Sequence, residues 1–151
     1  MLSFNIIKLK PLIDLQAKNA LTIVNLLVVD DDHDDTAIIK DAIEEVSSKH
    51  VVHCLHKSEK LFDYLDSIKP VELPSLIILD YNMPIITGVA LLKQLKSSPL
   101  YKHIPVAVYS NSTFSKHKEE CLKAGACVYV SKASTVREIE KNLKEILSHC
   151  L

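Results

Sequence analysis

The chain has 151 residues and a formal net charge of −1, with 48% hydrophobic and 25% charged residues. These are average values for globular proteins, which argues against a disordered or fibrous chain, and the length suits one domain. Lysine and arginine are dispersed, so the sequence lacks the extended basic surface typical of nucleic-acid-binding proteins. The longest uncharged apolar-rich run, residues 20–29, is far shorter than the ~20 residues that cross a bilayer, so neither nucleic acid nor membrane is an expected partner.

Five short apolar, β-branched runs alternate along the chain with segments of helical period. In chain order the expected strands are residues 23–29, 51–55, 76–79, 106–109 and 127–130. The expected helices are residues 35–46, 58–68, 88–95, 115–125 and 134–147. The first, third and fourth strands are apolar without alternation, which is typical of strands covered on both faces. The pattern predicts a (βα)5 domain of the α/β class, doubly wound around a parallel five-stranded sheet.

Local signals predict where several helices begin and end. Asp32 or Asp34 is expected to cap the first helix. Thr135 and Glu138 have the spacing of a capping box at the last helix. Gly125 stands where the fourth helix is expected to stop.

Two features indicate the cellular compartment: the segment before the first expected strand, and the cysteines. Residues 1–22 lack the continuous apolar core of a secretory signal and are expected to be a weakly ordered extension or a short helix, outside a domain of residues 23–151. The chain has four cysteines, Cys54, Cys121, Cys127 and Cys150. Because they include no CxxC pair, we interpret them as reduced thiols of a cytoplasmic protein.

Polar residues follow four of the expected strands, at the edge where sites form in open parallel sheets. Asp30 and Asp31 follow the first strand, Asp80 the third, Ser110 the fourth and Lys132 the fifth. Crowded carboxylates repel one another unless a cation relieves them, and Mg²⁺ prefers such oxygen ligands. A carboxylate can attack phosphorus, while a hydroxyl and an amine stabilise phosphoryl oxygens. Each residue alone has an ordinary structural explanation, but together they predict a phosphoryl-transfer site.

Four segments carry a resemblance to a known family: "LLVVDDD", "LIILDYNMP" with Gly88, "IPVAVYSNS" and "AGACVYVSKAS". They resemble the receiver domain of bacterial two-component response regulators of the single-domain, CheY-like type, over about residues 24–148. The resemblance implies the flavodoxin-like strand order 2-1-3-4-5. It also implies a phosphoacceptor that takes a phosphoryl group from a histidine kinase or a phosphotransfer protein and catalyses only its own phosphorylation and dephosphorylation.

The resemblance implies a role for each site residue. Asp80 is the phosphoacceptor and a direct ligand of Mg²⁺ or Mn²⁺. Asp31 is a second direct ligand, Asp30 acts mostly through water, and the backbone carbonyl of Asn82 is a third direct ligand. Lys132 is the phosphate-binding lysine.

A further pair of residues is implied to carry the signal. Ser110 is the switch hydroxyl, and the rotamer of Tyr129 couples to it. Phosphorylation is expected to pull both inward and to repack the surface of the fourth helix, fifth strand and fifth helix. Because the last helix closes the chain, we expect output through contact with an unidentified target protein, or through a homodimer at that surface.

Four departures from the family pattern are visible. In the family, a proline usually follows the lysine and is joined to it by a cis peptide bond, but here the residue is Ala133. A cis bond before a residue other than proline costs ~2.5–4 kcal/mol. Thr87 replaces an acid and is expected to cap the third helix. Asn111 replaces a small residue, and residues 69–75 account for a long spacing between the first and third strands.

Two alternative functions remain. One is an adaptor that uses the receiver fold without phosphorylation. The other is a haloacid-dehalogenase-like phosphatase, with Asp30 and Asp32 as its Asp-x-Asp pair, although that hypothesis leaves Asp80 unexplained. A histidine metal site is not expected, because His53 and His56 would face opposite sides of a strand, and His33 is expected to be exposed near the acidic cluster.

Overall fold

A computed structural model describes residues 23–151, so the expected extension at residues 1–22 lies outside the described residues. Five strands form one sheet: β1 (Asn25–Val29), β2 (Val51–Leu55), β3 (Leu76–Leu79), β4 (Val106–Ser110) and β5 (Val128–Ser131). All neighbouring strands are parallel, and their order is β2-β1-β3-β4-β5. The predicted α/β class and strand order are therefore confirmed.

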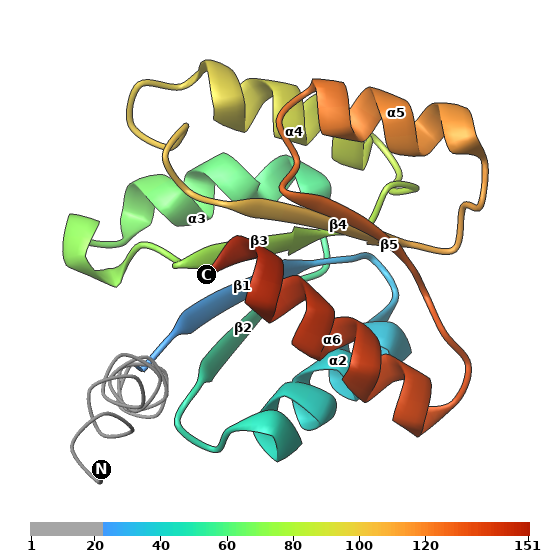
Figure 1. Cartoon of the computed structure of the whole chain (residues 1–151). Coiled ribbons are helices and arrows are strands. Elements are labelled where there is room, and N and C mark those ends of the chain that lie inside the picture. The colour runs from blue at the N-terminus through green and yellow to red at the C-terminus, as the bar shows by residue number, and fades with distance from the viewer. Residues whose placement is uncertain (1–22) are drawn as a thin grey trace, which may run out of the picture.

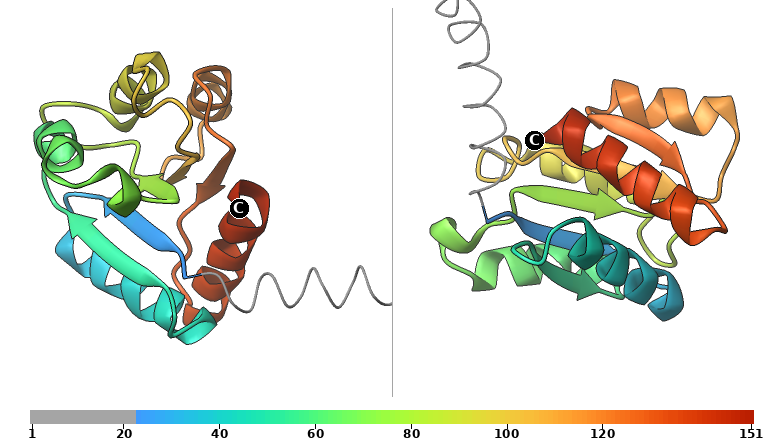
Figure 2. Two further views of the ribbon diagram at one scale, coloured as in Figure 1. Left: turned by 90° about the vertical axis from the view of Figure 1, so that its left-hand side faces the viewer. Right: turned by 60° about the horizontal axis from the view of Figure 1, so that its bottom comes forward.

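Five α-helices cover the two faces of the sheet. They are α2 (His33–Val46), α3 (Leu61–Ser67), α4 (Gly88–Ser97), α5 (Ser115–Lys123) and α6 (Val136–Cys150). Short 3₁₀ turns, η1 (Ser58–Lys60) and η2 (Pro70–Glu72), flank α3. Helices α3, α4 and α5 lie on one face, and α2 and α6 lie side by side on the other (Figure 1; Figure 2). No helix of this described part is long and apolar enough to cross a membrane.

Each central strand sends side chains into two separate cores. Leu27 and Val29 pack with the buried residues of α3 and α4, whereas Leu26 and Val28 pack with those of α2 and α6. Successive side chains of a strand point to opposite faces, so both sets must be apolar when helices cover both faces. This requirement explains why β1 shows no polar alternation.

The helix ends follow the predicted signals. The Asp32 carboxylate accepts hydrogen bonds from the backbone N–H groups of Asp34 and Asp35, at 2.9 and 3.2 Å, which identifies Asp32 as the N-cap of α2. Thr135 accepts from the backbone of Glu138 at the start of α6. Gly125, just after α5, has a φ of 106°, which favours glycine.

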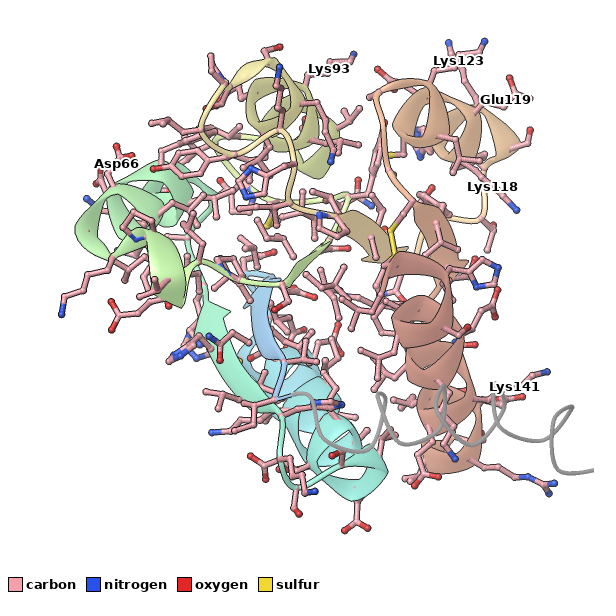
Figure 3. The ribbon with its side chains drawn as sticks, turned by 60° about the vertical axis from the view of Figure 1, so that its left-hand side comes forward. Asp66, Lys93, Lys118, Glu119, Lys123 and Lys141 are labelled. Carbon is pink, nitrogen blue, oxygen red and sulfur yellow. A yellow bond between two sulfur atoms is a disulfide. The ribbon has the colours of Figure 1, made fainter. Side chains whose placement is uncertain are left out.

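A disulfide joins Cys127, which directly precedes β5, to Cys150 in the last turn of α6 (Figure 3). The expectation that all four cysteines are reduced thiols is wrong for this pair and correct for Cys54 and Cys121. The helix after β5 runs back along the sheet, so its last turn returns to the point where the strand begins. Sequence spacing alone does not reveal this proximity.

Candidate functional site

Three carboxylates meet at the carboxyl edge of the sheet. Asp30 and Asp31 follow β1 and Asp80 follows β3, and these two strands are neighbours in register, Val29 opposite Leu79. One carboxylate oxygen of each aspartate lies within 4.8 Å of the others. Asp30 and Asp80 are buried, with 2% and 7% of their surface exposed, whereas Asp31 is exposed. The predicted convergence of the acids is thus observed.

Lys132 enters this cluster from the end of β5. Its backbone N–H donates to the Ser110 carbonyl at 2.9 Å, which fixes the lysine beside β4. Its ammonium donates to Asp30 at 2.6 Å and to Asp35 at 2.7 Å, and it lies 3.7 Å from Asp80 Oδ1. The sequence interpretation missed Asp35. Sequence spacing offers no signal for this contact, because Asp35 and Lys132 are brought together only by the packing of α2 beside the end of β5.

Burial and charge shape the ionisation of these groups. Burial raises the pKa of Asp80 to about 6, and the positive charge of Lys132 opposes this shift. Burial also raises the pKa of Asp30, although the hydrogen bond from Lys132 acts to lower it. For Lys132, burial lowers the pKa, but the hydrogen bonds to Asp30 and Asp35 outweigh it and leave the pKa above the ordinary lysine value.

The donor set fits a hard divalent cation. The three carboxylates lie close together, and of the three only Asp31 is exposed. Asp80 Oδ1 is buried and, within residues 23–151, has no hydrogen-bond partner. A buried acceptor without a partner carries a desolvation cost that a cation would relieve. Asn82 lies in the loop two residues after Asp80 and is exposed. The role of its backbone carbonyl as a metal ligand stays a prediction.

Ser110 ends β4, the neighbour of the strand that leads to Asp80, and Tyr129 lies on β5 at the other side of β4. Ser110 is fully buried, and its hydroxyl oxygen accepts from the backbone N–H of Ser112 at 3.3 Å. The Tyr129 hydroxyl donates to the carbonyl of Ser112 at 2.7 Å, and its ring is only 7% exposed. Tyr129 is therefore buried in this structure, where Ser112 offers its hydroxyl an acceptor, and its coupling to Ser110 stays a prediction.

Gly88 holds the loop that follows Asp80. Its N–H donates to the Tyr81 carbonyl at 2.9 Å, and a Cβ at this position would lie 2.0 Å from the Asp80 carbonyl oxygen. Gly88→Ala should therefore destabilise the protein by about 1–3 kcal/mol in urea unfolding, as overpacking does. Helix propensity alone predicts the opposite sign, a gain of up to about 1 kcal/mol. A more stable variant would contradict this interpretation.

The departures from the family pattern leave the charged groups in place. The Lys132–Ala133 peptide bond is trans, unlike the cis bond that usually precedes the proline at this place in the family pattern. Thr87 caps α4 by accepting from the backbone of Ala90 at 3.3 Å, as predicted. Asn111 is exposed and lines, together with Asp35 and Lys132, a cavity of about 200 Å³.

Two histidines lie beside the acidic cluster. His33 is exposed, as expected, and its ring stacks on that of His56 with centroids 3.6 Å apart. His56 Nδ1 lies 3.3 Å from the Asp30 carbonyl oxygen. The sequence interpretation missed this stack, which joins the first residue of α2 to the segment that follows β2. Among the described residues, Asp30, Asp31 and Asp80 form the one group of three or more such side chains that converges as a metal site would.

Comparison with known proteins identifies the family. The sequence model for "Response regulator receiver domain" matches residues 26–144. The chain is 30% identical over 122 residues to two-component response regulator ORR8 of Oryza sativa, covering 81% of this chain and 97% of the relative. The chain therefore belongs to the response regulator receiver domain family. Domains of this family are signalling domains that bind a divalent metal and receive phosphoryl groups, and membership excludes the dehalogenase-like alternative.

Solved structures share the fold. The phosphorylated cyanobacterial phytochrome response regulator RcpA has a TM-score of 0.76 and 24% identity, covering 85% of this chain and 94% of that chain. The Mn²⁺-bound form of response regulator Rcp1 has a TM-score of 0.72 and 23% identity, covering 83% and 92%. These similarities agree with the strand order and helix placement described above.

Proposed function

We propose that Asp80 accepts a phosphoryl group from a histidine kinase or a phosphotransfer protein, in a reaction that needs Mg²⁺ or Mn²⁺, and that the domain then signals through altered protein–protein contacts. The observation that carries this proposal is the position of Asp80, a buried carboxylate within reach of two further carboxylates and an ammonium. We take residues 23–151 as the receiver domain.

In the proposed reaction, a carboxylate oxygen of Asp80 attacks phosphorus. The new O–P bond forms as the P–N bond of the phosphohistidine breaks, and the electron pair of that bond returns to the imidazole nitrogen. The charge on the phosphoryl oxygens is then balanced by the Lys132 ammonium and by the Ser110 hydroxyl, which can donate once it turns toward them. Both groups are fixed by neighbouring strands, β5 and β4.

The proposed ligands of the divalent ion are Asp31, Asp80 and the backbone carbonyl of Asn82, with Asp30 acting mostly through water. The ion would neutralise the carboxylates and the charge on the transferred group. The convergence of three carboxylates and the unpartnered Asp80 Oδ1 support this assignment. The similarity to a Mn²⁺-bound structure of Rcp1 supports the class of metal.

The proposed signal passes through Ser110 and Tyr129 to the surface of α5, β5 and α6. Both residues contact Ser112, so a movement of the Ser110 hydroxyl toward a phosphoryl group would disturb the loop that accepts the Tyr129 hydrogen bond. Phosphorylation biases such a two-state element by adding charge. The target protein, or a second copy of the chain, would bind this surface.

We place the domain in the cytoplasm, the compartment that it would share with the phosphodonor proteins proposed above. The disulfide between Cys127 and Cys150 opposes this assignment, since reducing compartments keep thiols reduced. In a reducing cytoplasm the pair would exist as two thiols.

The test is Mg²⁺-dependent phosphoryl uptake. The chain should take up one phosphoryl group from acetyl phosphate in Mg²⁺ and none in EDTA. Borohydride reduction followed by peptide mass spectrometry should locate the group at Asp80. Stoichiometric uptake at another residue, or no uptake in Mg²⁺ with either acetyl phosphate or a phosphorylated phosphotransfer protein, would overturn the proposal and favour the adaptor alternative.

A further inference from the structure

Lys132 divides its hydrogen bonds between two carboxylates, and only one of them belongs to the three-carboxylate cluster. Asp35 lies in the first turn of α2, outside the group of Asp30, Asp31 and Asp80. Its carboxylate accepts from the Lys132 ammonium at 2.7 Å, nearly as closely as Asp30 does at 2.6 Å. Charge-assisted hydrogen bonds of this length are about twice as strong as neutral ones. Asp35 is therefore a principal partner of the lysine.

This arrangement leaves Asp80 without a hydrogen bond from the lysine, although the two groups remain an ion pair. An ammonium has three N–H donors, and two of them are directed to Asp30 and Asp35. The distance from Lys132 Nζ to Asp80 Oδ1 is 3.7 Å, beyond hydrogen-bond range, and that oxygen has no other partner among the described residues. The buried Asp80 Oδ1 beside the ammonium thus accepts no hydrogen bond, whereas the Asp35 carboxylate accepts one from Lys132.

We propose that Asp35 is a positioning residue that holds Lys132 away from Asp80 and competes with the phosphoryl group for its ammonium. This inference rests on the proposed function and adds to it a residue, Asp35, that influences the free energy of phosphorylation. A ligand shifts an equilibrium only by the difference in its interactions with the two states. The ammonium must give up its bond to Asp35 to bind the phosphoryl group, and the loss of this bond makes the free energy of phosphorylation less favourable. Asp35 therefore weakens phosphoryl binding.

Exposure makes the exchange of partners feasible. The Asp35 side chain is 32% exposed, so water can solvate its carboxylate when the lysine leaves. The Asp30 side chain is 3% exposed and cannot be solvated in this way, so its bond to Lys132 is costly to break. Asp35 is consequently the partner that the lysine can give up.

The test uses the affinity for beryllofluoride, a phosphoryl analogue, in Mg²⁺. Asp35→Asn keeps the size of the side chain and removes its charge, and we expect it to bind beryllofluoride about five- to tenfold more tightly than the wild type. The backbone N–H of Asp35 still bonds to Asp32, so the cap of α2 is retained. The matched control is Asp34→Asn, which removes the same charge from the same helix turn without touching Lys132; we expect it to change the affinity less than twofold.

A double-mutant cycle separates this role from a structural one. In a Lys132→Met background, Asp35→Asn should change beryllofluoride affinity by less than twofold, because the competing bond no longer exists. Equal effects of Asp35→Asn and Asp34→Asn, weaker binding by Asp35→Asn, or an undiminished effect without Lys132 would each overturn the inference. These outcomes require that the wild type binds the analogue. A wild type that binds no beryllofluoride and takes up no phosphoryl group would instead refute the proposed function, and the inference with it.

Discussion

Asp80→Asn is expected to stabilise the metal-free protein by about 2–3 kcal/mol at pH 7 while abolishing phosphoryl uptake. The Asp80 side chain is 8% exposed, and burial raises its pKa to about 6. Each pKa unit corresponds to about 1.36 kcal/mol, so ionising this group in the folded protein is costly. Asparagine keeps the shape of the side chain and never ionises, and it lacks the nucleophilic carboxylate. Unfolding in urea with EDTA measures the gain.

The pH dependence of this gain has a fixed sign. In the unfolded chain Asp80 loses its proton near pH 4, but in the folded protein it keeps the proton up to about pH 6. Between these values the unfolded state binds fewer protons, so the contribution of Asp80 to stability falls as pH rises. The difference between the variant and the wild type should be absent below about pH 4, grow from pH 4 to 6 and stay constant above pH 6.

A surface carboxylate provides the control for Asp80→Asn. Asp63 pairs with Lys60 on the exposed side of α3, and its side chain is 70% exposed. Asp63→Asn should change stability by less than about 0.5 kcal/mol at pH 7, as expected for a surface position. A stability gain at position 80 that did not depend on pH, or one that Asp63→Asn matched, would refute the assigned cost of burying the Asp80 carboxylate.

The fold could be predicted from the sequence because packing against two cores requires a recognisable residue pattern in the strands. The runs that contain Leu26–Val29 and Leu76–Leu79 are apolar at every position, and this pattern indicates helices on both faces. Boundaries were less accurate. The last helix runs to Cys150, beyond the expected residue 147, because Cys150 in its final turn packs against the core and is joined to Cys127 beside β5.

The site was predictable to the extent that strand ends determine it. Asp30 and Asp80 follow adjacent strands, and any parallel sheet with this order brings them together. Contacts made by side chains from helices were not predictable in this way. The bond from Asp35 to Lys132 depends on how α2 rotates against the sheet, and the stack of His33 on His56 depends on where α2 begins and on the conformation of the segment after β2.

Loss of the disulfide is expected to cost roughly 3 kcal/mol of unfolding free energy. Cys127 and Cys150 are 23 residues apart, and closing a loop of this length restricts the unfolded chain by about that amount in the chain-entropy description. Cys150→Ser should therefore unfold at lower urea concentration than the wild type under oxidising conditions. A dithiol reductant should lower the stability of the wild type to the same level and leave the variant unchanged. Cys54→Ser, which removes a free and partly exposed thiol, is the control and should respond to the reductant as the wild type does.

The reduced protein should nevertheless keep its fold, because α6 is held by more than the disulfide. Ile139, Leu143 and Ile146 form its buried stripe, and Leu143 and Ile146 are fully buried between the sheet and α2. Burying a side chain of this size contributes about 1.5–3 kcal/mol, so the stripe together outweighs the crosslink. Reduction should lower the unfolding midpoint without changing the circular dichroism of the folded state. A loss of helical signal on reduction would show instead that the crosslink, and not the apolar stripe, keeps α6 on the sheet.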